Sequence, residues 1–324
     1  MTDIWLPLLG GLVLLILGGD LLVRGAVRVA ERLGISPLVI GLTLVGFGTS
    51  MPELVTSVQA ALSGAPGIAY GNIVGSNIAN ILLIAGASAL LYPIVVTAPA
   101  LRRDAMVMLA VAVLFAAIAP FVPMGRGIGA GFLVALTAYV IVTLQQDRAR
   151  NGGALHDKET ALEALDPGLV PQPAREASLL VSLLIAVAGL ALVIGGGAAL
   201  VRGAVALATS FAIPETVIGL TIVAVGTSMP ELVTSVMAAL RRQGDVAFGN
   251  IVGSNIVNIL GIGGVTALIA PTSVPGPIAS FDAPVMVVVT LLIVLLAATG
   301  LRIARWEGAV LLAGYGSYLV VIWP

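Results

Sequence analysis

The chain has 324 residues, of which 59% are hydrophobic and only 10% are charged, and its formal net charge is −1. Soluble globular proteins carry about 25% charged residues, so this composition excludes an ordinary soluble fold. The chain has no cysteine and one histidine, which argues against thiol chemistry and against metal sites built from these residues. The near-neutral charge provides no basic face for nucleic acid. We therefore expect an all-α polytopic protein within a lipid bilayer.

Apolar stretches long enough to cross a bilayer recur along the whole chain. One helical crossing needs about 20 mostly apolar residues, and ten stretches approach that length. In chain order, they lie at 4–23, 38–62, 70–91, 105–120, 128–144, 178–201, 216–240, 248–270, 284–300 and 308–323. The charged, proline-containing segment 145–177 predicts a cytoplasmic linker with a short surface helix near 157–165. We expect two five-helix units, 1–144 and 178–324, on either side of this linker.

The distribution of arginine and lysine predicts the orientation of these spans. If the N-terminus lies outside, only Arg126 and Arg202 of the fifteen basic residues fall in outer segments. Basic residues concentrate in cytoplasmic loops, so both termini are expected outside. The same distribution supports the number of spans, because one missing helix would disturb it.

Two blocks of sequence occur twice, each with an offset of 178 residues. Residues 39–62 and 217–240 differ at only four positions, and residues 70–82 and 248–260 differ at two. Five spans precede the linker and five follow it, so the second copy should cross in the opposite direction. Inverted repeats of this kind are typical of secondary transporters, whose substrate site lies near the midplane. Duplication alone would preserve apolar packing positions, whereas these blocks also preserve Thr, Ser, Pro, Glu and Asn.

Glu53 and Glu231 occupy matching positions near the middle of their spans. A carboxylate at that depth is costly unless something compensates its charge. All fifteen basic residues lie at span ends or in loops, so no buried lysine or arginine is expected beside them. Protonation, a bound cation or a water-filled cavity remain as compensation, and each of the three implies a functional site.

Proline directly precedes both glutamates. Pro52 and Pro230 cannot donate a helical hydrogen bond to the carbonyls of Gly48 and Gly226. We therefore expect an unwound helix with free carbonyl oxygens at the depth of each carboxylate. Hydroxyl groups in the same turns come from Thr49, Ser50, Thr227 and Ser228.

The second block places polar side chains along one helical face. Residues spaced four apart share a face, and this spacing occurs in Asn72, Ser76 and Asn80 and again in Asn250, Ser254 and Asn258. We favour Ser76, Asn80, Ser254 and Asn258 as ligands. For Asn72, Asn77, Asn250 and Asn255, interhelical hydrogen bonding is an equal alternative. Carboxylate, hydroxyl, amide and carbonyl oxygens suit Ca²⁺ and Na⁺, which would compete for the same negative charge.

Two pairs of short motifs in the repeated blocks resemble those of a known family. The paired GTSMPE motifs (48–53 and 226–231) and GNIVGSNI motifs (71–78 and 249–256) resemble the two α-repeats of the Na⁺/Ca²⁺ exchanger family, in the cation/Ca²⁺ antiporter superfamily. The resemblance implies electrogenic Na⁺-for-Ca²⁺ antiport in a prokaryotic type of membrane protein. It also implies that the first and sixth spans move against the other eight.

The resemblance further implies a set of ion-binding residues. These are Thr49, Ser50, Glu53, Ser76, Asn80, Thr227, Ser228, Glu231, Ser254 and Asn258, joined by backbone carbonyls near Gly46 and Ala224. The K⁺-dependent branch and some prokaryotic members carry Asp at the position of Asn258, so the asparagine weakens the case for K⁺ dependence. We expect no cofactor besides the transported Na⁺ and Ca²⁺, and a monomer should suffice for transport.

Two other transport functions remain open on the sequence. A H⁺/Ca²⁺ antiporter is possible in principle because both glutamates could carry protons. A Ca²⁺ channel is a weaker alternative, since a channel usually surrounds its pore with subunits related by rotation. An enzyme is the weakest interpretation, because no nucleophile with a base, Asp pair or zinc motif is arranged in the chain.

Overall fold

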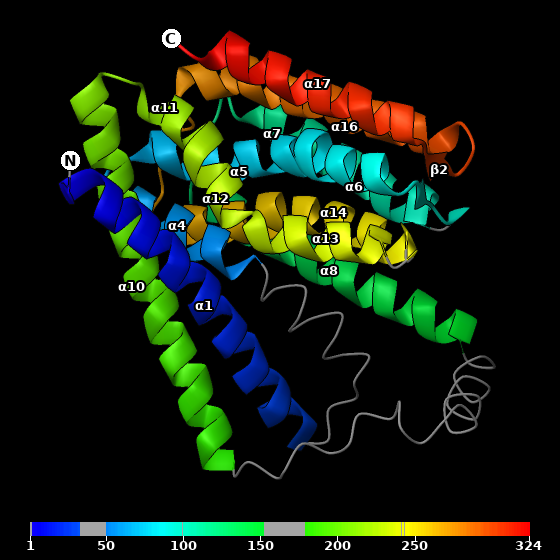
Figure 1. Ribbon diagram of the computed structural model, residues 1–324, viewed down its shortest axis with the longest axis horizontal. Coiled ribbons are helices and arrows are strands. Elements are labelled where there is room, and N and C mark those ends of the chain that lie inside the picture. Colours follow the sequence, from blue (N-terminus) through cyan, green and yellow to red (C-terminus); the bar gives the residue numbers. More distant parts are fainter. Residues whose placement is uncertain (1, 33–49, 99, 152–178, 241, 243) are drawn as a thin grey trace.

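The computed structural model describes residues 2–32, 50–98, 100–151, 179–240, 242 and 244–324. This part of the chain is predominantly helical, which confirms the predicted all-α class (Figure 1). Within it, the only named strands are the two-residue β1 (Ile94–Val95) and β2 (Arg302–Ile303), which pair antiparallel.

The helices of the two halves follow a similar order. The first half contains α1 (Thr2–Arg32), α4 (Met51–Leu62), α5 (Pro66–Ala79), η2 (Asn80–Ala85), α6 (Gly86–Leu91), η3 (Ala100–Ala105), α7 (Met106–Ile118) and α8 (Arg126–Asn151). The second half contains α10 (Leu179–Phe211), α11 (Glu215–Ile218), η4 (Gly219–Val223), α12 (Ala224–Thr227), α13 (Met229–Leu240), α14 (Gly244–Ile256), η5 (Val257–Ile262), α15 (Gly263–Ile269), η6 (Ile278–Asp282), α16 (Ala283–Ala298) and α17 (Arg305–Ile322). The η segments are π-helical turns, which are rare and often lie at functional sites.

Six helices in the described ranges are long and apolar enough to cross a membrane, and a seventh crossing is obtained if α11–α12 and α13 form one bent span. Charged residues within η3 and at the start of α17 shorten the apolar part of two further helices. The expected span 38–62 lies partly outside the described residues, as do most of the linker 145–177 and its short helix. Ten spans therefore stay a prediction.

Several helices extend beyond the spans predicted from hydrophobicity. α1 continues to Arg32, α8 to Asn151 and α10 to Phe211, instead of ending near 23, 144 and 201. The sequence pattern marks only the apolar part of a helix, whereas backbone hydrogen bonding continues into the more polar turns beyond it.

α1 and α10 are a pair of long antiparallel helices that extend away from the rest of the molecule (Figure 1). Glycines recur every seven residues along their contact, at positions 11, 18 and 25 of α1 and 189, 196 and 203 of α10. A Cβ atom added to Gly18 would lie 2.8 Å from the backbone nitrogen of Val193, and one added to Gly196 would lie 2.8 Å from that of Leu15. Small residues thus allow close backbone packing, and we call this contact the glycine seam.

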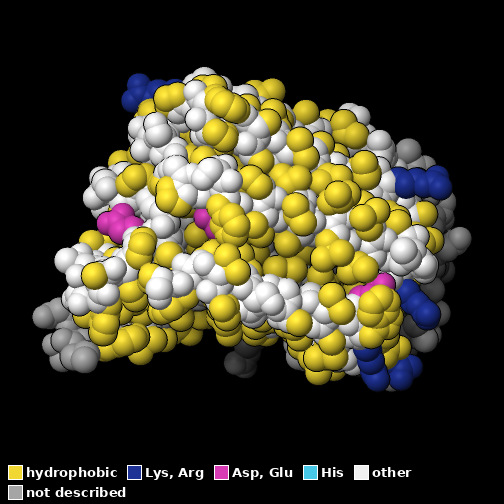
Figure 2. Space-filling model, turned by 90° about the horizontal axis from the view of Figure 1, so that it is seen from above, with side chains coloured by type: hydrophobic (Ala, Val, Ile, Leu, Met, Phe, Trp, Pro, Cys, Tyr) yellow, Lys and Arg dark blue, Asp and Glu magenta, His cyan; other side chains and the backbone are white. Residues whose placement is uncertain are grey.

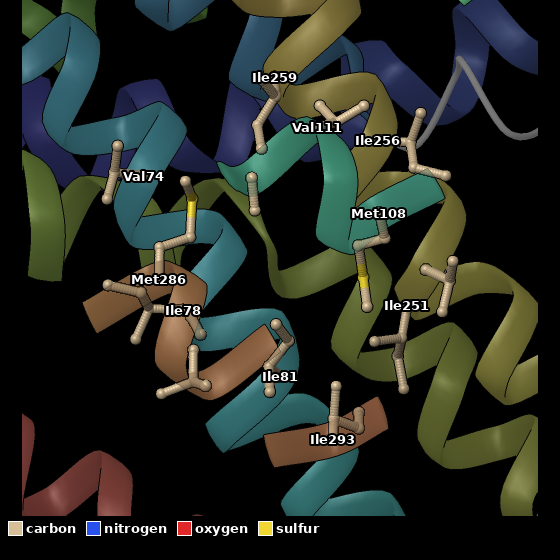
Figure 3. Close-up of a cluster of buried hydrophobic side chains, with 14 of the residues drawn as sticks. Val74, Ile78, Ile81, Met108, Val111, Ile251, Ile256, Ile259, Met286 and Ile293 are labelled. Carbon is tan, nitrogen blue, oxygen red and sulfur yellow. The ribbon is translucent and has the colours of Figure 1, made fainter. Parts of the chain in front are cut away.

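The most deeply buried helices are those of the second repeated block. The segment Pro66–Leu91 has 83% of its apolar window buried and Val246–Ile269 has 78%, compared with 22% for Leu179–Phe211. Figure 3 shows side chains from these two segments packed with α7 and α16, including Ile78, Met108, Ile256 and Met286. By contrast, hydrophobic side chains cover much of the surface seen in Figure 2, with basic side chains near its margins.

Candidate functional site

Each of the two glutamates lies in the first turn of a helix, Glu53 in α4 and Glu231 in α13, and an interruption at Ser228 precedes α13. Ser50 precedes α4 and Ser228 separates α12 from α13, with similar backbone angles of φ −88°, ψ 6° and φ −82°, ψ 10°. The axes on either side of Ser228 differ by 48°. Proline in the first turn explains the break, because it lacks the N–H that would continue the preceding helix. The predicted interruption next to Glu231 is therefore present.

Hydrogen bonds connect the two copies crosswise at Ser50 and Ser228. Ser50 Oγ donates a hydrogen bond to Glu231 Oε1 over 3.1 Å, and Ser228 Oγ donates one to Glu53 Oε1 over 2.9 Å. All four residues are buried, and each glutamate side chain is only about 2% exposed. Residues 178 positions apart in the sequence thus lie in one polar cluster, the crosswise Ser–Glu cluster.

Glu53 is incompletely compensated in this cluster. Its Oε2 atom is buried without a hydrogen-bond partner, and none of the described basic residues forms an ion pair with it. One serine hydroxyl does not neutralise a carboxylate, and an unpaired charge in an apolar interior is strongly unfavourable. This geometry is suited to a positively charged ligand.

Asn72 and Asn250 attach the second block to the first in the same way. The Asn72 amide donates to the Glu53 carbonyl at 3.1 Å and to Ser57 Oγ at 2.9 Å. The Asn250 amide donates to the Glu231 carbonyl at 3.4 Å and to Ser235 Oγ at 2.9 Å. Both asparagines therefore hold the helix that carries a glutamate. The partner serines were not predicted, although both follow their glutamate by four residues.

Further oxygens without a protein partner lie along the second block. Ser76 Oγ, Asn80 Oδ1 and Asn258 Oδ1 are buried and accept no hydrogen bond from the described residues. Leaving such a group unsatisfied costs about 1–3 kcal/mol. Ser76 follows Asn72 by one helical turn, about 6 Å along the axis. Buried oxygens of this kind, without protein donors, are available to a ligand.

The amide of Asn80 has a defined orientation. Its Nδ2 donates to Asn255 Oδ1 over 3.0 Å, so its Oδ1 remains available for a ligand. Asn255 in turn donates to Met108 Sδ, whereas Asn77 donates to the Ile73 carbonyl of its own helix. Asn255 thus connects α14 to the start of η2.

The remaining predicted residues have varied surroundings. Thr227 Oγ1 donates to Asn72 Oδ1 over 3.0 Å, which connects α12 to α5. The Ala224 carbonyl accepts a hydrogen bond from the Ser228 amide. Ser254 is buried on α14. Gly46 and Thr49 lie outside the described residues.

The described acidic residues contain no group of three or more that could hold a metal by carboxylates alone. An ion bound here would therefore take most of its ligands from hydroxyl, amide and carbonyl oxygens. Such mixed oxygen sets suit Na⁺ and Ca²⁺.

Comparison with known proteins relates the whole chain to one group. Residues 4–145 and 181–323 match the family model described as sodium/calcium exchanger protein. The chain is 39% identical to sodium/calcium exchanger MaX1 of Methanosarcina acetivorans, covering 99% of both chains. It is 36% identical to inner membrane protein YrbG of Escherichia coli, covering 98% of this chain and 95% of that protein. The solved structure of the sodium-calcium exchanger NCX_Mj soaked with Na⁺ and Sr²⁺ is similar with a TM-score of 0.63 and 33% identity, covering 97% of this chain and 96% of that one.

Proposed function

Because this chain belongs to the sodium/calcium exchanger family and is an integral multi-pass membrane protein, we propose that it exchanges Na⁺ for Ca²⁺ across the cell membrane. We propose no enzymatic activity for this protein. The observation that carries it is the crosswise Ser–Glu cluster, in which each of two buried glutamates accepts a hydrogen bond from a serine of the other copy.

The proposed ion site lies near the midplane between the two copies. Glu53 and Glu231 supply two negative charges, enough to neutralise one Ca²⁺. The buried oxygens of Ser76, Asn80 and Asn258 without protein partners support their role as ligands. Na⁺ ions would occupy overlapping oxygens and compete for the same charge. Thr49, Ser50, Thr227, Ser228, Ser254 and the carbonyls near Gly46 and Ala224 complete the proposed set.

The proposed architecture is ten spans in two inverted repeats, with both termini outside. Contacts between loops support this arrangement. β1 pairs with β2, and Met124 pairs with Thr272. The first contact joins two segments that are both assigned to the cytoplasm, and the second joins two that are both assigned outside. An odd error in the number of spans between them would separate these partners by the thickness of the membrane.

Transport is proposed to occur by alternating access. Either cation type neutralises the site, whereas an empty, ionised site is costly to move through an apolar barrier. The α1–α10 pair is the proposed moving unit, because the glycine seam connects its two helices along much of their length. Its other contacts include α4 and α12, which flank the crosswise Ser–Glu cluster. One chain contains both copies, so we propose that a monomer transports.

Purified protein in liposomes tests the proposal. Vesicles loaded with Na⁺ and diluted into Na⁺-free medium with ⁴⁵Ca²⁺ should accumulate Ca²⁺, and collapse of the Na⁺ gradient should stop the uptake. The control replaces the Na⁺ gradient with a pH gradient of equal driving force. Uptake that follows only the pH gradient would support a H⁺/Ca²⁺ antiporter, and uptake without any counter-ion would support a channel.

A further inference from the structure

An aspartate–tyrosine pair occurs in both halves of the protein. Tyr139 Oη donates to Asp104 Oδ1 over 3.0 Å, and Tyr318 Oη donates to Asp282 Oδ1 over 2.8 Å. Asp104 and Asp282 are 178 residues apart, the offset of the repeated blocks. In both halves the bond connects a π-helical turn, η3 or η6, to the last long helix, α8 or α17.

The two pairs differ in how the charge of the aspartate is compensated. Arg103 forms an ion pair with Asp104, with 2.6 Å between Nε and Oδ1. The position that corresponds to Arg103 in the second half holds Phe281. Among the described residues, none forms an ion pair with Asp282, although this side chain is only about 3% exposed. A buried carboxylate without an ion pair is neutralised either by a proton or by a positively charged ligand.

A cavity of about 290 Å³ opens beside Asp282. It lies between α11, η4, η6 and the end of α17, which are neighbours in Figure 1. Val217, Leu220, Phe281 and Val321 form much of its wall. Thr216 supplies the other polar side chain of the lining. The cavity is therefore mostly apolar, and Asp282 is the only charged residue among the described residues that line it.

We propose that this cavity binds the ammonium group of an amphiphilic amine, with Asp282 as its counter-ion. Ca²⁺ needs about six to eight oxygen ligands, and only Asp282 and Thr216 contribute side-chain oxygens to the lining. An alkylammonium ion needs one carboxylate and gains from burial of its apolar part. Small-molecule sites of about 300–1,000 Å³ are mostly apolar with a few polar groups, and this cavity is at the lower end of that range.

The cavity is next to the segment that carries the crosswise Ser–Glu cluster. Thr216 and Leu220 lie on the stretch that continues through η4 into α12, which ends at Thr227. The proposed orientation puts this end of the molecule at the outer surface. The amine could come from an aminolipid of the outer leaflet or from a soluble amine, and both offer the same ammonium group.

Calorimetric titration of n-hexylammonium into the full-length protein tests this site. The protein is held in nanodiscs of phosphatidylglycerol, which has no ammonium group, and 1-hexanol is the uncharged comparison. We expect saturable binding of one hexylammonium per chain above the lipid background, and none for hexanol. Asp282→Asn keeps an acceptor for Tyr318 but removes the charge, and should weaken binding at least about tenfold, which corresponds to about 1.4 kcal/mol.

Two further variants make the result specific. Val321→Trp fills the cavity without touching the carboxylate and should also weaken binding. Asp20→Asn removes an exposed carboxylate on α1 and should leave binding unchanged. Equal affinity of wild type and Asp282→Asn, or equal binding of hexanol, would overturn the proposal. If phosphatidylethanolamine competes with hexylammonium for the wild-type protein, the natural ligand is a lipid amine. If it does not compete, the natural ligand is a soluble amine.

Discussion

At the scale of single residues, charge compensation distinguishes three kinds of acidic side chain in this protein. Asp20 is exposed and pairs with Arg24 over 2.8 Å, one turn further along α1, so its presence in an apolar span needs no ligand. Asp104 pairs with Arg103. Glu53 is buried with one serine hydrogen bond and no ion pair to a described residue. Only a group of the third kind depends on a proton or a bound cation for neutralisation.

Replacement of either glutamate should stop exchange. Glu53→Gln and Glu231→Gln each keep the side-chain shape but remove half of the charge of the site. Loss of one buried charge partner costs about 2–5 kcal/mol, so Na⁺-dependent ⁴⁵Ca²⁺ uptake should fall by about 30-fold or more. Gln59→Met is the matched control, because the second copy has Met237 at that position, and its uptake should stay near wild type. Normal Ca²⁺ flux in either glutamine variant would contradict the assignment.

Replacement of Asn258 by aspartate should change the ion preference without abolishing transport. Asn258→Asp adds a third carboxylate where a buried amide oxygen now has no partner. The added charge should favour divalent over monovalent ions, so more Na⁺ would be needed to inhibit Ca²⁺ uptake by half. Competition curves for Na⁺ against ⁴⁵Ca²⁺ measure this shift. Identical curves for variant and wild type would count against Asn258 as a ligand.

At the scale of elements, interruptions of regular helix coincide with the polar residues. α4 starts, and α12 ends, at the serines of the crosswise cluster, and the π turns η2 and η5 contain Asn80 and Asn258. A π turn shifts the register of the side chains that follow it, because it inserts an extra residue into a turn. The polar stripe of the second block is thus redirected at the residues proposed to bind ions.

The glycine seam allows a test that compares neighbouring residues. Gly196→Ala introduces a Cβ 2.8 Å from the Leu15 backbone nitrogen, whereas nothing lies within 4 Å of a Cβ at Gly195. Overpacking of this kind costs about 1–3 kcal/mol, so Gly196→Ala should lower the thermal unfolding temperature. Gly195→Ala should be neutral or slightly stabilising, because alanine favours helix by up to about 1 kcal/mol over glycine. Equal unfolding temperatures would show that the close packing contributes nothing.

At the scale of the whole molecule, burial separates central from peripheral helices. The two segments of the second block are mostly enclosed by protein, whereas only a small part of the apolar windows of α8 and α10 is buried. In a membrane protein such exposed apolar surface faces lipid, where it needs no further partner. The polar groups of the candidate site are consequently at the centre, away from the lipid-facing surface.

The proposed orientation is testable because the natural chain has no cysteine. Phe121→Cys lies in a segment assigned outside and Leu301→Cys in one assigned to the cytoplasm, and both side chains are exposed. In intact cells, a membrane-impermeant maleimide should label Phe121→Cys and leave Leu301→Cys unlabelled until the membrane is permeabilised. The reverse labelling would invert the orientation, and labelling of both from outside would exclude ten spans.

The amino-acid sequence by itself determined the helical class, the family and the offset of 178 residues. Each of these follows from local properties: hydrophobicity sets which segments form apolar helices, and identity between two stretches can be read without knowing where they lie. The predicted break beside Pro230 also follows from local chemistry, since proline removes a hydrogen bond wherever it occurs.

Only the tertiary structure decided which partners meet. The crosswise bonds of Ser50 to Glu231 and Ser228 to Glu53, the support of Asn80 by Asn255, and the cavity beside Asp282 all join residues from distant segments. The ends of α1 and α10 also differed from the prediction. A hydrogen bond depends on atomic positions within a few tenths of an ångström, and those positions result from the packing of whole helices rather than from any local pattern.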